Sequence, residues 1–312
     1  MKESITCVNS IFEQPWWLEA MAPGQWDTVE VEKNGKIVAR LPFVKQKRFG
    51  CNLLGLPDFT QTLGYWIDDS NAKNAKKNSK KKDIITELIL KLPKNYNVDF
   101  ALDHTCDYLF PFIWNGFRIQ LAYSYRIEDI HNLDLLWNGF ADKIRTDIKK
   151  AQKIVTVEDN HSIDDLITLR NKTFARQGRK LYDYSIALKR LDTALLEKNA
   201  RKLLCAVDSE GKIHAAAYFV YDEKCCYYLL GGGDPELRSS GATSLLVWEG
   251  IKFASAVSQS FDFEGSMIEP IERFFRAFGG VPTPYWRVTR LNSILSIVDY
   301  IKPKMKKLFG WN

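Results

Sequence analysis

The fold of the second half of the chain is decided by residues 202–256, which read KLLCAVDSEGKIHAAAYFVYDEKCCYYLLGGGDPELRSSGATSLLVWEGIKFASA. Three apolar runs, Lys202–Asp208, His214–Tyr221 and Cys225–Leu230, are separated by short polar turns. This spacing predicts three antiparallel strands in a meander. Three glycines and a polar loop come next, and the apolar pattern of Ala242–Ala256 then predicts a helix.

The segments around this stretch continue an alternation of helices and strands. Helices are expected over 133–153, 162–175 and 185–199 before it, and a strand, a helix and a strand over 260–263, 269–277 and 285–290 after it. The first ~120 residues also run helix, strands, helix, strands, with a hairpin at Asn34-Gly35. We therefore expect an α+β fold with two domains, at 1–125 and 126–312.

Composition limits the class of protein. The chain has 312 residues, 46 % of them hydrophobic and 26 % charged, which is typical of a globular protein of one large or two ordinary domains. The N-terminus MKESITCVNS lacks the apolar core of a signal peptide, so we expect a cytoplasmic protein. Six cysteines without a CxxC pair and four histidines without ligand spacing predict reduced thiols and no metal.

Four segments together resemble the FemAB-like acyltransferases of the GNAT superfamily. They are the opening helix and hairpin, the basic helix KIRTDIKKAQK (143–153), FDFEGS (261–266) and ERFFRAFGG (272–280). The last two are similar to the D-F-x-G and F-K-x-G-F-G-G segments of that family. The resemblance implies tandem GNAT-like domains in three α/β layers, each with a mixed, mostly antiparallel sheet flanked by helices.

The sequence departs from the family pattern at two places. Phe275 occupies the position of the lysine in F-K-x-G-F-G-G, and the nearest cations are Arg273 and Arg276. The helical hairpin that some Fem aminoacyltransferases carry has no room around residues 180–200. The missing hairpin favours acetyl-CoA or another acyl-CoA as donor over an aminoacyl-tRNA, whereas Phe275 supports the alternative of a protein that has lost catalysis.

The resemblance places the acyl-CoA where a strand turns into a helix. Backbone N–H groups and the helix dipole favour a pyrophosphate at such a point, and RSSGAT (238–243) follows the family pattern loosely. Backbone amides of the stretch Leu229–Gly232 would polarise the thioester carbonyl. An ordinary helix start with a glycine turn remains the alternative. The residues assigned to the donor are Leu230, Gly231, Gly232, Arg238, Ser239, Ser240, Gly241, Ala242 and Thr243.

Two acids in an apolar strand are the candidates for proton transfer. Asp262 and Glu264 are two residues apart, which places their side chains on one face of a strand. Either could accept the proton of an amine, with Glu264 preferred, or form a salt bridge to Arg273 or Arg276. By analogy with GNAT enzymes, Tyr285 is the candidate acid for the leaving thiol; its competitors are Tyr227 and Tyr228.

Basic and amphipathic segments are the candidates for partner binding. Arg145 and Lys149 in the basic helix, with Arg273 and Arg276, are assigned to the substrate. The segment KNAKKNSKKK (73–82) is expected to be a solvated loop, or to contact phosphates. The tail SILSIVDYIKPKMKKLFGWN (293–312) suits either a membrane interface or the core of the protein itself.

These observations lead to one function and two alternatives. The expected activity is transfer of an acyl group from acyl-CoA to an amine, such as an amino sugar or a lipid- or nucleotide-linked precursor of a surface polymer. Such an enzyme would be cytoplasmic, with possible peripheral contact to the inner face of the membrane and no DNA partner. The alternatives are an aminoacyl-tRNA-dependent Fem-type enzyme and an inactive GNAT-fold binding protein.

Overall fold

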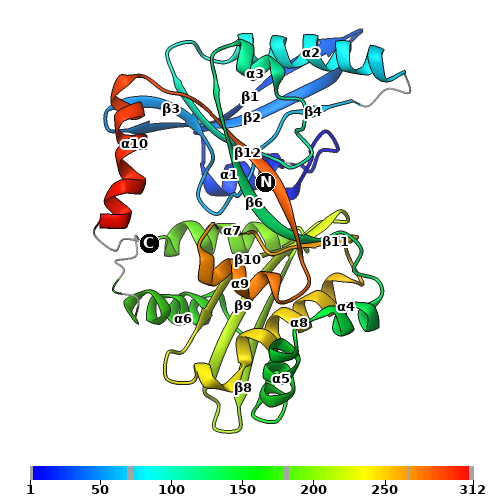
Figure 1. Ribbon diagram of the computed structural model, residues 1–312, viewed down its shortest axis with the longest axis vertical. Coiled ribbons are helices and arrows are strands. Elements are labelled where there is room, and N and C mark those ends of the chain that lie inside the picture. The colour runs from blue at the N-terminus through cyan, green and yellow to red at the C-terminus, as the bar shows by residue number, and fades with distance from the viewer. Residues whose placement is uncertain (1–2, 69–72, 177, 179–182, 266, 309–312) are drawn as a thin grey trace. The chain divides into compact units, whose positions relative to one another are not determined.

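The computed structural model describes residues 3–68, 73–176, 178, 183–265 and 267–308 (Figure 1). Its contacts divide the chain into two compact units: residues within 1–122 and 284–312 form the first, and residues within 123–283 the second. The sequence-based division differs from this one, because residues 284–312 group with the first unit. They do so because residues 286–290 pair with residues 98–102 inside that unit's sheet.

The first unit contains a mixed sheet in the order β1-β2-β3-β5-β12-β6, with β4 paired to β2. Asn34 and Gly35, both at positive φ, form the expected turn between β1 and β2. The other pairings with printed register are antiparallel except β3–β5. The strands are β1 (Trp26–Lys33), β2 (Lys36–Arg48), β3 (Cys51–Gly55), β4 (Trp66–Ile67), β5 (Asn97–Leu102), β6 (Arg118–Ile127) and β12 (Val281–Arg290).

Helices flank this sheet, and the longest of those described, α2, corrects the sequence analysis. The lysine-rich segment 73–82 is not a loop, because α2 runs from Asn74 to Lys91 and includes nearly all of it. Lysine and alanine are good helix formers, so the segment continues the apolar helix that follows. The helices of this unit are η1 (Ile11–Glu13), α1 (Pro15–Met21), α2 (Asn74–Lys91), α3 (Phe110–Trp114) and α10 (Ser293–Leu308).

The tail helix α10 exposes most of its apolar stripe. Leu295 is buried, whereas Ile294, Ile297 and Tyr300 are exposed. The helix does not end at Pro303. The side chains of residues 302–308, and residues 309–312 entirely, lie outside the described part of the chain, and the basic and aromatic end of the predicted tail is among them.

The second unit is built on the sheet β6-β11-β10-β9-β8-β7. The pair β10–β11 is parallel, and the other pairs are antiparallel. The meander predicted from residues 202–230 is confirmed as β8, β9 and β10. The strands not yet given are β7 (Val155–Glu158), β8 (Arg201–Asp208), β9 (Ile213–Tyr221), β10 (Cys225–Gly233) and β11 (Ser260–Asp262).

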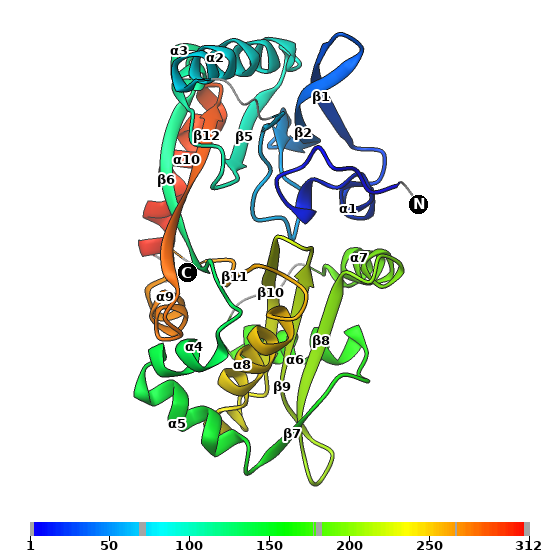
Figure 2. The same cartoon turned by 90° about the vertical axis from the view of Figure 1, so that its right-hand side faces the viewer.

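Helices cover both faces of the second sheet, as Figure 2 shows, with α5 and α8 on one side and α6 and α7 on the other. Residues 133–153 form two helices rather than one, because Phe140 is extended and its ring is buried. The helices are α4 (Leu133–Gly139), α5 (Asp142–Ala151), α6 (Ile163–Arg176), α7 (Ser185–Glu197), η2 (Arg238–Ser240), α8 (Ala242–Ala254) and α9 (Glu269–Arg276).

The mixed, mostly antiparallel sheet with helices on its faces confirms the predicted α+β class. A cluster rich in aromatic rings, including Phe140, Phe219, Phe261 and Phe278, fills the core of the second unit. Among the described residues, no helix is both long and apolar enough to cross a bilayer.

Candidate functional site

The parallel strands β10 and β11 separate partway along their length. They pair only from Cys225–Ser260 to Tyr227–Asp262, although β10 continues to Gly233 alongside β9. The chain after β11 turns instead to β6, where the Phe263 N–H donates to the Tyr125 carbonyl at 2.9 Å. The backbone of β10 beyond Tyr227 therefore has no β11 partner, which is the arrangement expected for a thioester between two diverging strands.

A β-bulge marks the point of separation. Tyr228 pairs with Phe219 and Leu230 with Tyr218, so Leu229 is the extra residue on β10. A bulged residue is left out of the ladder, and its amide is available for a hydrogen bond outside the sheet. The bulge therefore provides the kind of backbone donor that the sequence analysis sought between Leu229 and Gly232.

The Tyr228 side chain extends along the same region. A Cβ on Gly231 would lie 2.0 Å from the Tyr228 hydroxyl, so only glycine leaves room for it. Burial raises the pKa of Tyr228 to about 12, which keeps the phenol protonated at neutral pH. Tyr228 is thus a protonated hydroxyl beside the free part of β10.

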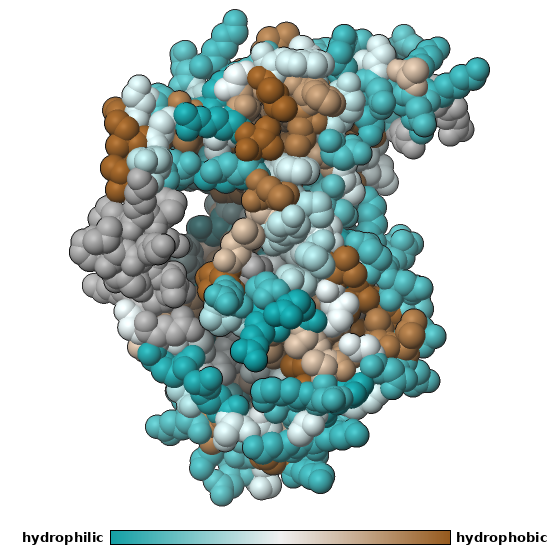
Figure 3. Space-filling model, in the orientation of Figure 1, coloured by the Kyte–Doolittle hydropathy of each residue, from teal (hydrophilic) through white to brown (hydrophobic). Residues whose placement is uncertain are grey.

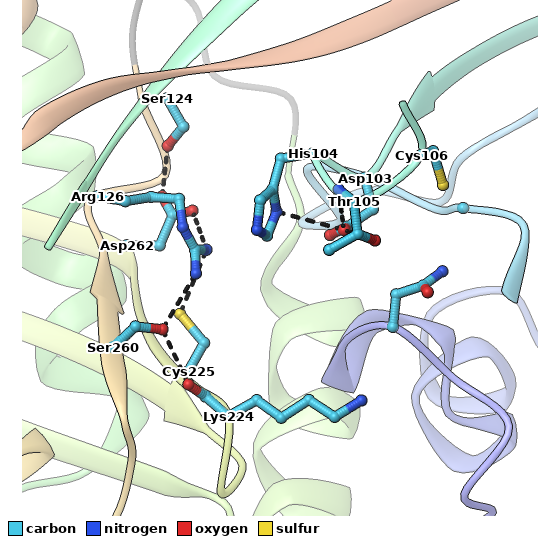
Figure 4. Close-up of polar contacts among 12 residues, drawn as sticks. Asp103, His104, Thr105, Cys106, Ser124, Arg126, Lys224, Cys225, Ser260 and Asp262 are labelled. Atoms are coloured by element: carbon cyan, nitrogen blue, oxygen red, sulfur yellow. Dashed lines mark hydrogen bonds and ion pairs between the residues drawn. The ribbon is translucent and has the colours of Figure 1, made fainter. Parts of the chain in front are cut away.

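Asp262 ends β11 in a buried ion pair. Arg126 of β6 donates to its Oδ2 at 2.9 Å, and the Ser124 hydroxyl donates to its Oδ1. Figure 4 shows the Arg126 guanidinium directed at Asp262, Ser260 and Cys225. Burial raises the pKa of Asp262, and the Arg126 charge opposes that shift. The predicted salt bridge of this acid to Arg273 or Arg276 is wrong, because Arg126 is the partner.

Glu264 differs from Asp262 in having a bare carboxyl oxygen. Its Oε1 is buried and has no hydrogen-bond partner among the described residues. The strand has ended at Asp262, and Glu264 is in the left-handed region at φ 57°, so the two acids do not continue one alternating strand. Its backbone N–H donates to Asp262 Oδ1 at 2.7 Å. Burial, followed by the nearby Asp262 charge, raises the pKa of Glu264 well above its usual range.

An unpaired buried carboxyl at strained backbone is costly to the fold. Such residues cluster at functional sites, where a raised pKa produces a stronger base once ionised. The ring of Phe275, at the family's lysine position, contacts both Phe263 and Tyr228, with centroid distances of 5.2 and 6.2 Å. It packs between the two diverging segments.

The start of α8 has features that suit an anionic group. Gly241 caps the helix at φ 81°, and the Ala242 N–H donates to the Ser240 hydroxyl at 3.3 Å. The next two amides, of Thr243 and Ser244, have no partner within the helix, and the dipole of a 13-residue helix favours an anion there. Arg238 and Ser239 are exposed beside them.

Lysine 150 adds a cation to this turn, and sequence analysis had missed it. Its Nζ donates to the Ser239 carbonyl at 2.6 Å, and both Lys150 and the neighbouring Lys149 are exposed. Gly241 is required because a Cβ there would lie 2.4 Å from the Asp147 carbonyl of α5. The free amides and the nearby cations therefore fit a diphosphate. Gly241 itself is needed for the close approach of α5.

The glycines at the end of β10 serve packing. A Cβ on Gly232 would lie 2.7 Å from the backbone nitrogen of Arg170, so this glycine admits α6 against the strand. The Gly233 N–H donates to the Thr173 hydroxyl at 3.1 Å, which in turn donates to the Gly233 carbonyl at 2.9 Å. The glycines lie within β10 and do not form a turn.

The remaining candidates are placed less directly. Arg145 donates to the Asn138 carbonyl at 2.9 Å and joins α5 to the end of α4. Arg276 binds Glu272 at 2.9 Å on α9, and Arg273 is exposed on the same helix. Tyr285 belongs to β12 and is grouped with the first unit.

Arg126 was also absent from the candidates drawn from the sequence. A charged residue in the apolar run LAYSYRI (121–127) is the signal that could have indicated it, because a buried arginine requires a carboxylate. Among the described residues, no group of three or more His, Cys, Asp or Glu side chains could hold a metal ion.

Residues 139–266 match the family model described as "Acetyltransferase (GNAT) domain". A search of curated proteins by sequence found no match.

Several solved structures share the fold across both units. The crystal structure of FemX has a TM-score of 0.68 at 17 % identity, and the match covers 96 % of this chain and 99 % of that one. L-PGS from Bacillus licheniformis has a TM-score of 0.52 at 12 % identity, with 93 % and 96 % covered. A tandem GNAT protein from the clavulanic acid biosynthesis pathway has a TM-score of 0.51 at 11 % identity, with 85 % and 82 % covered.

The family match covers β10, η2, α8 and β11, the elements that build the candidate site, and the structural matches extend over nearly the whole chain. Residues 139–266 of the second unit therefore match a GNAT-type acetyltransferase domain, and the chain shares its fold with FemX and with the tandem GNAT protein.

Proposed function

We propose that the protein is an N-acyltransferase that moves an acyl group from an acyl-CoA thioester to an amine. The observation that carries this proposal is the separation of β10 from β11 with the bare Glu264 carboxyl directly after β11. The diphosphate of the donor would lie on η2 and the start of α8, with Arg238 and Lys150 as counter-charges. The thioester carbonyl would accept a hydrogen bond from the Leu229 amide.

The reaction needs one proton acceptor and one proton donor. The amine nitrogen attacks the thioester carbon and forms the C–N bond, and its proton passes to the Glu264 carboxylate. The tetrahedral intermediate collapses, the C–S bond breaks, and the thiolate takes a proton from the Tyr228 hydroxyl. The burial that raises the pKa of Glu264 makes it a stronger base than an exposed carboxylate. In this scheme Tyr228 has the role first considered for Tyr285.

The acceptor is proposed from the resemblance to be an amino sugar or another precursor of a surface polymer. The exposed apolar stripe of α10 would suit contact with a membrane that carries a lipid-linked acceptor. Arg273, exposed on α9, is the cation left open for such an acceptor.

Thermal unfolding with coenzyme A, acetyl-CoA and no ligand tests the donor. A ligand present at a hundred times its dissociation constant stabilises the folded state by about 2.7 kcal/mol. We expect a clear rise in Tm for wild type and a much smaller rise for Arg238→Glu. An equal rise in both proteins would exclude the proposed diphosphate site.

Release of free thiol from acetyl-CoA in the presence of amines tests the chemistry. We expect Glu264→Gln to lower kcat about a hundredfold or more while the donor-dependent rise in Tm persists. Glu269→Gln, an exposed glutamate on α9, is the matched control and should retain wild-type turnover.

The second candidate function is transfer from an aminoacyl-tRNA, and the overlap with FemX over 96 % of the chain favours it. This alternative requires transfer of a labelled amino acid from charged tRNA to an amine, with no Tm response to coenzyme A. A well-folded protein that responds to neither donor would be the inactive binding protein.

A further inference from the structure

The helix α2 carries lysines on the face that elsewhere packs into the core. Its second half buries Ile84, Ile85, Leu88 and Ile89. Residues four apart lie on one side of a helix, so the row 77, 81, 85, 89 and the row 80, 84, 88 each run along one side. The apolar face therefore continues toward the N-terminus as Lys77, Lys80 and Lys81.

This lysine face borders a cavity of about 360 Å³ within the first unit. The opposite side comes from β4 and from the segments around Asn9 and Thr105. In Figure 1 the N-terminal end of α2 lies beside β4, and Figure 3 shows a hydrophilic surface over this part of the helix. All three lysines are partly buried, so their ammonium groups are not simply extended into solvent.

The charges around the cavity are unbalanced. Lys77 and Lys81 are like charges one helical turn apart, a spacing that disfavours the helix. Lys80 has no hydrogen bond or ion pair with any described residue, and Lys81 reaches Asp107 only at 3.5 Å. The carboxylate in the lining, Asp68, already binds Lys36 at 3.2 Å. The lining carries three lysines and one aspartate, a formal excess of positive charge that a bound anion would offset.

The rest of the lining narrows the class of anion. Asn74, Asn78 and Thr105 add neutral polar groups, and the Thr105 hydroxyl is fixed by donating to Asp103 at 2.7 Å (Figure 4). The volume lies at the lower end of the range for small-molecule pockets and exceeds the size of a single inorganic anion. Three ammonium groups with neutral donors suit an ester that carries more than one phosphate.

We propose that this cavity is a binding site for the diphosphate group of a small organic molecule. The lysines of α2 bind the phosphate oxygens, and the polar residues of β4 and the Thr105 segment enclose the group. The site is formed by the first unit alone, so the inference stands whether or not the second unit transfers acyl groups. It also gives a function to the lysine run, which the proposed acyl transfer does not use.

Isothermal titration with inorganic pyrophosphate at low salt tests the proposal on the full-length protein. The cavity variant carries Lys77→Gln, Lys80→Gln and Lys81→Gln. The control carries Lys33→Gln, Lys76→Gln and Lys94→Gln, three exposed lysines of the same unit that do not line the cavity. Both lose the same charge. We expect affinity to fall at least about tenfold in the cavity variant and to remain near wild type in the control.

Further arms separate this site from others. Arg238→Glu should leave pyrophosphate binding to this cavity unchanged, which separates it from the proposed donor site. The single variant Lys80→Gln should weaken binding several-fold even if the triple variant proves poorly folded by circular dichroism. A nucleoside diphosphate and a polyprenyl diphosphate in detergent should each displace pyrophosphate if they are sources of the group.

Three results would overturn the proposal. Wild type could fail to bind pyrophosphate, or both triple variants could lose affinity equally, which would indicate unspecific charge attraction. Alternatively, a short RNA could bind in a way that requires the three lysines but is not displaced by pyrophosphate; the lysine face would then be an RNA surface.

Discussion

The buried ion pair between Arg126 and Asp262 makes a sharp prediction about the second unit. In Arg126→Met, the Asp262 carboxylate keeps only the Ser124 hydroxyl and the Glu264 N–H as partners. Both charged side chains are 5 % exposed, so water cannot replace the lost guanidinium. Removing one member of such a pair costs about 3–5 kcal/mol. For a unit of this size, that corresponds to a fall in Tm of about 6–20 °C.

The assay is thermal unfolding of a double-mutant cycle. Asp262→Leu leaves Arg126 buried without its carboxylate partner and should also destabilise the protein strongly. The double variant replaces the pair with apolar side chains and should lose much less than the sum of the two single variants. Arg276→Met, which breaks an exposed pair with Glu272, is the control and should leave Tm nearly unchanged.

The pH dependence supplies an independent check. Without Arg126, the pKa of buried Asp262 should rise further, because burial already raises it and the opposing cation is gone. The folded state then holds a proton that the unfolded chain has released, so stability increases as pH falls. The deficit of Arg126→Met should therefore be smaller at pH 5 than at pH 8. The reasoning would be refuted if the two single variants lost little stability and their losses added up to that of the double variant. It would also be refuted if the loss of stability in Arg126→Met grew toward pH 5.

Three further predictions concern single positions. Because the pKa of Glu264 is raised in the folded state, the stability of wild type falls as pH rises above the unfolded pKa of about 4.3. Glu264→Gln should remove this contribution to the dependence of unfolding free energy on pH between pH 5 and pH 8. An unchanged pH dependence would contradict the burial of Glu264. Gly241→Ala should lower the free energy of unfolding by more than the about 1–3 kcal/mol of a strained φ, because its Cβ would meet the Asp147 carbonyl. Gly211→Ala is the control in the same chemical denaturation, because Gly211 has φ 79° and open space around it, so that only the backbone strain contributes. Tyr228→Phe should lower kcat for thiol release with little change in KM, whereas equal kcat in both proteins would remove Tyr228 from the mechanism.

The sequence predicted the second sheet well because its strands are long and apolar and its turns are short and polar. The run 202–230 left few alternatives for β8, β9 and β10. It could not predict where β10 and β11 part, because that depends on the bulge at Leu229 and on the return of the chain to β6. The partnership of Arg126 with Asp262 joins residues far apart in the chain and leaves no periodic signal.

Local signals also misled the sequence analysis in a consistent way. The density of lysines in 73–82 indicated a loop, although lysine is a good helix former and α2 includes nearly all of this segment. Spacing placed Asp262 and Glu264 on one face, but the left-handed backbone at Glu264 ends the alternation. The assignment of Leu230, Gly231 and Gly232 to the donor stays a prediction; the structure adds that Gly231 leaves room for Tyr228 and Gly232 for α6.

The strand β12 has a consequence for the order in which the protein is made. Its residues 286–290 pair with 98–102 of β5, so the first sheet receives this strand only after the whole of 123–283 has been synthesised. At about 5–20 residues per second, the ribosome needs roughly ten seconds or more for that interval. During it, β5 presents an unpaired edge on the nascent chain, while the second unit has its complete sequence available to fold. The unit whose synthesis begins first is therefore the one whose sheet is completed last.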